Sequence, residues 1–249
     1  MRVVAVIPAR LASTRLPRKM LREIAGEPLL AWVYQGVKQC TTLAEVIVAT
    51  DSEEILGYCR QRGFDARMTS TTHRSGTERV HEVSSAVQAD VYLNVQGDEP
   101  LTRPEHIDSL IEVMRAPDVQ VGTLKTACTD IDINNPSAVK VVTDATGRAL
   151  YFSRATIPFD RDSTGPKYFK HLGFYAYRKT SLDNFVKWPE SSLECSERLE
   201  QLRFLENGTA IHVAETPFDT VGVDTEEDLR RVEKILGSRK HPGAISSRL

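Results

Sequence analysis

The chain has 249 residues, with 32 Lys and Arg against 34 Asp and Glu, so its formal net charge of -2 is close to neutral. This balance argues against nucleic acid as a primary partner, because proteins that bind a phosphate backbone usually carry a marked basic excess. No stretch approaches the roughly 20 apolar residues that span a bilayer, and the N-terminus lacks the pattern of a cleaved leader. We therefore expect no nucleic acid partner, no membrane insertion and a cytoplasmic location. The four cysteines form no CxxC pair, so neither a zinc site nor a disulfide framework is expected.

The first part of the chain alternates short β-branched runs with helical patterns, which is typical of an α/β protein with a largely parallel sheet. Ser52 stands where a helix N-cap is expected, and Gly63 stands where that helix should stop. The pattern predicts strands at 3–9, 45–51 and 91–96, and helices at 28–40, 52–64 and 77–88.

The middle of the chain has a different character, because its apolar runs lie too close together for a helix between every pair. Strands are expected there at 121–127, 138–144, 149–155 and 171–178, followed by a helical pattern at 190–206, a strand at 210–216 and a last helix at 225–236. We therefore expect a Rossmann-like α/β fold, mostly parallel, with an antiparallel subdomain at about 121–180. A single domain over 1–238 and a frayed tail at 239–249 complete this prediction.

The segment after the first strand is unusually basic. Residues 1–22 hold six basic side chains and no acidic one, which leaves 26 basic against 34 acidic side chains in the other 227 residues. The carboxyl ends of strands are where open α/β sheets bind ligands, so a small polyanion such as a triphosphate is expected beside Arg10, Arg15, Arg18, Lys19 and Arg22. The alternative is a solvated basic loop. Neither a Walker loop nor a GxGxxG, HExxH or GxSxG motif is present.

Carboxylates follow a second predicted strand in the segment NVQGDEP, residues 94–100. Asp98 and Glu99 should lie on the same sheet edge as the basic loop, where their oxygens would suit Mg²⁺ beside a triphosphate. The alternative is that Asp98 and Glu99 are ordinary solvent-exposed residues of a turn. Asp224 directly precedes the last helix. One interpretation is that Asp224 or Thr225 caps this helix. The other is that Asp224 faces Asp98 and is a second metal ligand.

Two further segments carry weaker signals. HRSGTERV, residues 73–80, is either a turn with an N-cap or a loop that reads a small polar ligand through Ser75 and backbone groups. The stretch from 153 to 178 offers Arg154, Arg161, His171, Tyr175 and Tyr177, whose ordinary role would be in the core or on the surface.

Taken together, these motifs resemble the 3-deoxy-manno-octulosonate cytidylyltransferases, the CMP-Kdo synthetases of Gram-negative bacteria, where Kdo is 3-deoxy-D-manno-octulosonate. The resemblance runs from Val3 to about Leu236 and rests on PARLASTRLPRKML, VATD, SGTER, NVQGDEP, VKVV, ALYFSRATIPFDRD, KHLGFYAYR, LEQLR and GVDT in family order. It implies a nucleotidyltransferase fold and transfer of CMP from CTP to the anomeric hydroxyl of Kdo for lipopolysaccharide biosynthesis. It also implies release of diphosphate, a Mg²⁺ cofactor and a homodimer.

The resemblance also implies roles for individual residues. The catalytic set is Arg10, Lys19, Asp98 and Asp224, and the metal ligands are Asp98 and Asp224. The nucleotide-binding set is Ala9, Arg10, Ser13, Lys19, Ser75, Gly76, Gln96 and Asp98. The sugar-binding set is Arg15, Gln96, Arg154, Arg161, His171, Tyr175, Glu200 and Gln201.

The sequence departs from the family at two places: Arg18 stands where many members have Gly, and the link between Asp162 and Tyr168 is short. Because of these departures, the sequence does not fix the sugar acid. The same reaction with 8-amino-Kdo or sialic acid is the alternative. An alternative of another class is a nucleotide-binding protein without catalysis.

Overall fold

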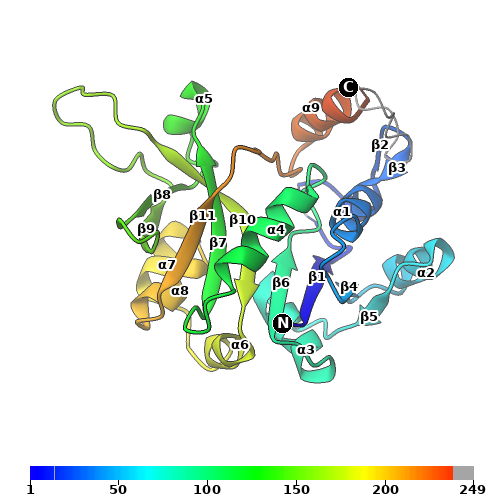
Figure 1. Ribbon diagram of the computed structural model, residues 1–249. Helices are drawn as coiled ribbons and strands as arrows, with labels where there is room; N and C mark the ends of the chain where they lie inside the picture. The colour runs from blue at the N-terminus through cyan, green and yellow to red at the C-terminus, as the bar shows by residue number, and fades with distance from the viewer. Residues whose placement is uncertain (14, 238–249) are drawn as a thin grey trace.

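The computed structural model describes residues 1–13 and 15–237 (Figure 1). The strands are β1 (Val3–Ala9), β2 (Glu23–Ile24), β3 (Glu27–Pro28), β4 (Glu45–Thr50), β5 (Ala66–Met68), β6 (Val91–Val95), β7 (Val121–Ala127), β8 (Lys140–Thr143), β9 (Ala149–Ser153), β10 (Phe169–Tyr177) and β11 (Ile211–Glu215). The helices are the 3-10 helix Lys19–Leu21 and α1 (Leu29–Lys38), α2 (Glu53–Arg62), α3 (Gly76–Ala86), α4 (Pro104–Val113), α5 (Asp130–Ile133), α6 (Lys179–Phe185), α7 (Ser192–Glu197), α8 (Gln201–Glu206) and α9 (Glu226–Gly237).

One nine-stranded sheet runs through the molecule in the order β11-β7-β10-β6-β1-β4-β5, with β8 and β9 attached beside β10. Its β6-β1-β4-β5 half is parallel, whereas β10 is antiparallel to both β6 and β7, and β8 and β9 pair with each other antiparallel. The predicted α/β fold and its antiparallel middle are therefore confirmed. The middle is continuous with the parallel half, and β11 pairs parallel to β7. The single-domain boundaries stay a prediction, and the tail at 239–249 lies outside the described residues.

The predicted helix boundaries have local causes. Ser52 caps α2 by accepting a hydrogen bond from the amide of Ile55 at 3.4 Å, and Gly63 ends this helix in the left-handed conformation with φ 67°. The segment 190–206, predicted as helical throughout, divides into α7 and α8 because Arg198 adopts a left-handed conformation with φ 54° and turns the chain between them.

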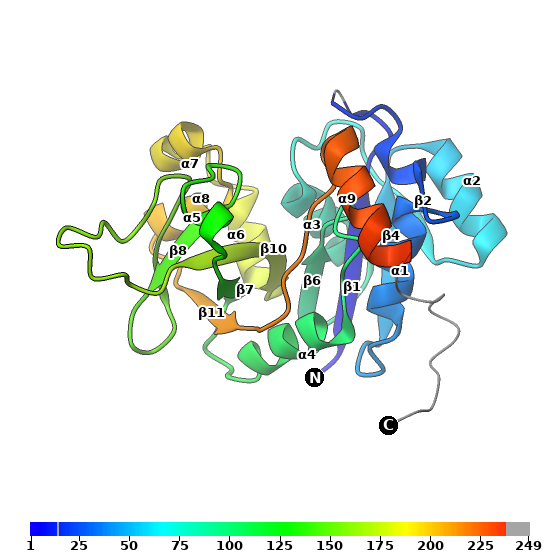
Figure 2. The same cartoon turned by 90° about the horizontal axis from the view of Figure 1, so that it is seen from above.

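Two cores lie on opposite faces of the sheet, because successive strand residues point to opposite faces. Figure 2 shows the helices arranged on both sides of the strands. Alternate residues of β1 pack with α1, α2 and α4 on one face, and the intervening residues of β1 pack with α3, α6 and α8 on the other. A third cluster joins α9 to the segment around Leu16 and to Trp32 of α1. This cluster fixes the C-terminal helix beside the basic loop.

Candidate active site

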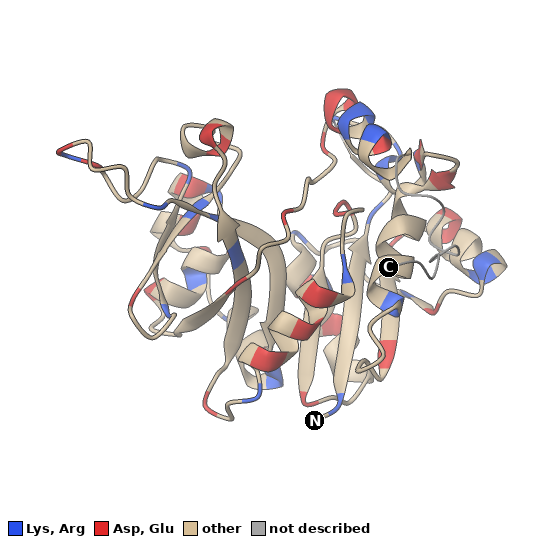
Figure 3. Cartoon of the chain, turned by 45° about the horizontal axis from the view of Figure 1, so that its top comes forward, with Lys and Arg blue, Asp and Glu red and all other residues tan. Residues whose placement is uncertain are grey.

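The ends of β1 and β6 deliver the basic loop and the NVQGDEP segment to one edge of the sheet, as predicted from their position after parallel strands. Neither strand contains a charged residue, and Figure 3 shows Lys, Arg, Asp and Glu concentrated on the surrounding helices and loops. Gly97 lies against the carbonyl of Pro8, where a Cβ would come within 2.7 Å of the oxygen. Glycine is therefore required for the two strand ends to approach this closely.

A first cavity of about 430 Å³ opens at this edge. It brings together many of the predicted site residues: Ala9, Arg10, Ser13, Arg15, Lys19, Ser75, Gly76, Gln96, Asp98, Glu200 and Asp224. Further lining residues were not predicted as site residues: Pro8, Ala12, Met20, His73, Arg74, Arg79 and Gly97.

Lys19 lies between the two predicted metal ligands. Its Nζ donates to Asp98 Oδ2 at 2.7 Å and to Asp224 Oδ1 at 2.9 Å, and Arg15 Nη2 lies 2.9 Å from Asp224 Oδ2. Burial favours the neutral forms of Lys19 and Asp224, but the opposite charges and hydrogen bonds outweigh it. The pKa of Lys19 is therefore raised and that of Asp224 is lowered. Both groups are charged at neutral pH.

The pair Asp98 and Asp224 fits a divalent cation. Both carboxylates contact the same ammonium nitrogen, so they face one point that already holds a positive charge. A backbone hydrogen bond of 2.9 Å from the amide of Val223 to the carbonyl of Asp98 holds the two segments together. One or two carboxylates beside phosphate oxygens is the donor set that Mg²⁺ takes in nucleotide sites.

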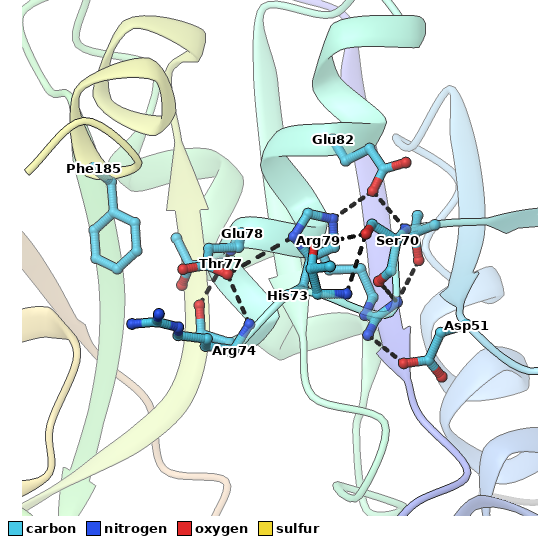
Figure 4. Close-up of polar contacts among 12 residues, drawn as sticks. Asp51, Ser70, His73, Arg74, Thr77, Glu78, Arg79, Glu82 and Phe185 are labelled. Atoms are coloured by element: carbon cyan, nitrogen blue, oxygen red, sulfur yellow. Dashed lines mark hydrogen bonds and ion pairs between the residues drawn. The ribbon is translucent and has the colours of Figure 1, made fainter.

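The loop before α3 is held by a polar network (Figure 4). His73 bonds to Glu82, which also accepts from the amide of Ser70 at 2.9 Å, and Arg79 contacts Asp51 at 2.8 Å. This network explains why His73 and Arg79 border the cavity. Arg79 also donates from Nη1 to the carbonyl of Ser70 at 3.3 Å, so these side chains fix the conformation of the loop.

Ser75 and Gly76 form the first turn of α3 at the cavity wall. Ser75 Oγ accepts from the amide of Glu78 at 3.2 Å, so the predicted N-cap is present. A Cβ at Gly76 would come within 3.6 Å of the side chains of Pro8, Asn94 and Gln96. The turn therefore packs closely against the ends of β1 and β6.

A second cavity of about 240 Å³ adjoins the first, and Gln96 and Glu200 line both. Of the other predicted sugar-binding residues it contains His171, Tyr175 and Gln201. The lining residues that were not predicted for this pocket are Thr77, Gly173, Tyr177, Arg198, Leu199 and Phe204. In the sequence, Tyr177 belongs to the KHLGFYAYR motif and Thr77 to the SGTER motif, which are the signals that could have indicated these two residues.

His171 is half-buried and uncharged. Burial lowers its pKa to about 3, and its Nε2 lies 2.9 Å from Thr123 Oγ1. The pKa of Tyr175 is raised by burial and by the neighbouring Tyr177 and Glu200. Both predicted residues can therefore exchange hydrogen bonds with a sugar as neutral groups.

Arg154 and Arg161 line neither cavity. Arg154 donates from Nε to the carbonyl of Glu197 at 2.7 Å and from Nη1 to the carbonyl of Pro136 at 3.0 Å. The side chain of Arg161 is 87% exposed, on the long loop that projects from the sheet between β9 and β10. Their predicted role in sugar binding stays a prediction, and the structure shows Arg154 fastening the end of α7.

The fold and the site define a nucleotide-binding α/β protein, and comparison with known proteins gives its family. The family model described as Cytidylyltransferase matches residues 4–212. The chain is 68% identical to the 3-deoxy-manno-octulosonate cytidylyltransferase of Koribacter versatilis, over 96% of this chain and 91% of that protein. It is 57% identical to the protein of the same name from Acidobacterium capsulatum, over 96% and 98%.

A solved structure of CMP:2-keto-3-deoxy-manno-octonic acid synthetase complexed with CTP superposes with a TM-score of 0.93. It is 42% identical in sequence and covers 96% of this chain and 100% of that chain. The chain belongs to the 3-deoxy-manno-octulosonate cytidylyltransferase family and is a nucleotidyltransferase. Among the described residues, no helix combines the length and apolar character needed to cross a membrane.

Proposed function

We propose that this chain transfers CMP from CTP to the anomeric hydroxyl of Kdo and releases diphosphate. The observation that carries this proposal is the pair of adjoining cavities, which share Gln96 and Glu200. The first is bordered by the cations of the basic loop, and the second is lined by hydrogen-bonding side chains suited to a polyhydroxylated sugar. The names of the relatives and the CTP complex of the similar structure support the same substrates.

The first cavity supplies the groups that a nucleoside triphosphate requires. Arg10, Ser13 and Lys19 would hold the triphosphate, with Arg15 near both substrates, while Ser75 and Gly76 face the cytidine side. At about 4 Å and an effective dielectric of 20, each unit charge pair is worth roughly 4 kcal/mol before solvation costs. Several cations at one wall would therefore favour binding of a polyanion.

The second cavity would orient the acceptor. Gln96, His171, Tyr175 and Gln201 offer donors and acceptors to hydroxyl groups, and Glu200 offers a carboxylate. Neutral His171 cannot pair with the sugar carboxylate as a cation. Electrostatic recognition of that carboxylate would therefore fall to an arginine, whose guanidinium can form two parallel hydrogen bonds to it.

In the reaction, the anomeric oxygen forms a bond to the α-phosphorus as the bond to diphosphate breaks, and the hydroxyl proton is released. No protein nucleophile is needed, so the chain contributes position and charge neutralisation. Asp98 and Asp224 would hold Mg²⁺, whose charge when bound would supply acidification of the attacking hydroxyl and polarisation of the α-phosphoryl group. Lys19 and Arg10 would stabilise the departing diphosphate.

The test is diphosphate release from CTP and Mg²⁺ with Kdo, 8-amino-Kdo and sialic acid as separate acceptors. We expect Kdo to be used with the highest kcat/KM. Preference for another acid would replace the acceptor in this proposal, and CTP binding without release for any acid would indicate a protein that binds nucleotide without catalysis. We also propose that the protein is a cytoplasmic homodimer and serves lipopolysaccharide biosynthesis. Light scattering and sedimentation measure the mass in solution and test the homodimer.

A further inference from the structure

Thr77 lies where the two cavities meet. It is the second residue of α3, directly after Gly76 of the first cavity, and its own side chain lines the second cavity. The residue is only 4% exposed. A short stretch of one helix therefore borders both cavities.

The hydroxyl of Thr77 is directed to Glu200. Oγ1 donates to Glu200 Oε2 at 3.0 Å and lies 3.5 Å from the hydroxyl of Tyr177. Figure 4 shows Thr77 on the same loop-to-helix segment as Arg74, on the side away from Asp51. The contact bridges α3 and the start of α8, which are 123 residues apart in the chain.

We propose that Thr77 is a positioning residue for the sugar acid: its hydroxyl holds the Glu200 carboxylate in the orientation that accepts hydrogen bonds from the acceptor's hydroxyls. This inference rests on the proposed function and adds a residue to which no role has been given. Ser75 and Gly76 belong to the same helical turn and are proposed to contact the nucleotide. The N-terminal end of α3 would therefore contact both substrates.

The charges around Glu200 agree with this role. Burial raises its pKa, whereas the hydroxyls of Thr77 and Ser75 lower it by donating to the carboxylate. Glu194 also raises this pKa and Arg203 lowers it, and Tyr175 and Tyr177 face Glu200 from β10. Loss of the Thr77 donor would leave a carboxylate that is more readily protonated and less directed.

The test compares Thr77→Val, which removes the hydroxyl and keeps the shape, with Thr77→Ser, which restores it. We expect Thr77→Val to raise the KM for the sugar acid on the order of tenfold, as loss of a hydrogen bond to a charged group allows. The KM for CTP should stay within about twofold, and Thr77→Ser should recover most of the affinity for the sugar acid. Equal rises in both KM values, or no rise for the sugar acid, would overturn the proposal.

A control variant separates this role from general loss of a buried hydroxyl. Ser181 is 3% exposed, its Oγ lies 2.7 Å from the carbonyl oxygen of Arg178 and 3.0 Å from that of Gln120, and it lines neither cavity. Ser181→Ala should lower stability without changing either KM. A rise in the sugar acid's KM equal to that of Thr77→Val would also count against the proposal.

A second readout does not depend on catalysis. In protein labelled with ¹³C at the glutamate carboxyl carbons, the Glu200 resonance is assigned by its loss in Glu200→Gln. Its pKa should be higher in Thr77→Val than in the wild type or Thr77→Ser, and an unchanged pKa would refute the contact. If the wild type used no sugar acid, the proposed function would fail, while this titration would still decide whether Thr77 governs Glu200.

Discussion

At the scale of single residues, Lys19 has two roles that follow from one geometry. In the free chain its ammonium contacts Asp98 at 2.7 Å and Asp224 at 2.9 Å, so it neutralises the carboxylates proposed to bind Mg²⁺. A triphosphate in the first cavity would offer Lys19 a new anionic partner. Metal and nucleotide should therefore favour each other's binding, in part because the nucleotide draws this cation from the carboxylates.

We predict that Lys19→Met binds Mn²⁺ in the absence of nucleotide about tenfold more tightly than the wild type, because the competing cation is gone. The same variant should bind CTP more weakly. Electron paramagnetic resonance of free Mn²⁺ and calorimetry with CTP measure the two effects.

The matched control is Arg18→Met, which removes a charge from the same loop. Arg18 pairs with Glu54 and is absent from the lining of the first cavity. If both variants changed Mn²⁺ affinity equally, the effect would reflect net charge and the direct competition by Lys19 would be refuted.

At the scale of elements, the segment between β11 and α9, residues 216–225, carries Asp224 from the antiparallel half of the sheet to the parallel half. His106 of α4 is fully buried against Phe174, and its Nε2 lies 3.0 Å from the carbonyl of Phe218 in this segment. Burial lowers the pKa of His106, and its Nδ1 accepts from the amide of Arg103. The ring is therefore neutral with its proton on Nε2, which donates to Phe218.

We predict that His106→Leu loses about 1–3 kcal/mol of unfolding free energy, because the partly buried carbonyl of Phe218 loses its donor. The variant should also bind Mn²⁺ more weakly, since Asp224 follows on the same segment. His106→Gln places an amide donor near the same carbonyl and should recover part of both losses. Urea unfolding and Mn²⁺ titration provide the measurements.

Tyr92 supplies the comparison for a loss of stability alone. Its hydroxyl donates to the carbonyl of Val87 at 2.6 Å beyond the C-terminal end of α3, and it lines neither cavity. Tyr92→Phe should reduce stability and leave Mn²⁺ affinity unchanged. If Tyr92→Phe also lost affinity for Mn²⁺, the effect of His106→Leu would reflect general destabilisation and not the contact with residues 216–225.

The same elements show what the sequence could predict. β1, β4 and β6 were predicted because continuous buried β-branched runs have a strong local signal, and α2 because its Ser52 cap and Gly63 stop are local too. β5 is three residues long and partly exposed, so it has little pattern of its own. α4 did carry a signal, with Pro104 at its start, and was not assigned.

The candidate site was predictable where topology alone brings residues together. The carboxyl ends of β1 and β6 must lie at one sheet edge, so the approach of Lys19 to Asp98 followed from chain order and strand direction. Arg154 could not be placed in this way. Its guanidinium is directed by the carbonyls of Pro136 and Glu197, and the position of Glu197 depends on a long-range contact of α7 with β9, in which Ser153 Oγ donates to Glu197 Oε1 at 2.6 Å.

At the scale of the whole molecule, His171 lies on β10, the strand that joins the antiparallel and parallel halves of the sheet, and its half-buried imidazole affects stability. The imidazole has an ordinary pKa of 6.5 in the unfolded chain and of about 3 in the folded chain, because burial opposes its charge. Between these values the unfolded state binds a proton that the folded state does not. The contribution of His171 to stability must therefore fall as the pH decreases below about 6.5.

We predict that His171→Gln removes this dependence. The difference in unfolding free energy between wild type and variant should change little from pH 8 to pH 7, because the histidine is mostly neutral in both states. It should then shift in the variant's favour by up to about 3 kcal/mol on going from pH 7 to pH 4, by linkage between folding and protonation. Urea unfolding at each pH measures the difference, and a difference independent of pH would show that His171 takes up a proton in the folded chain. Since carboxylates titrate in both proteins, only the difference between them reports on this one imidazole ring.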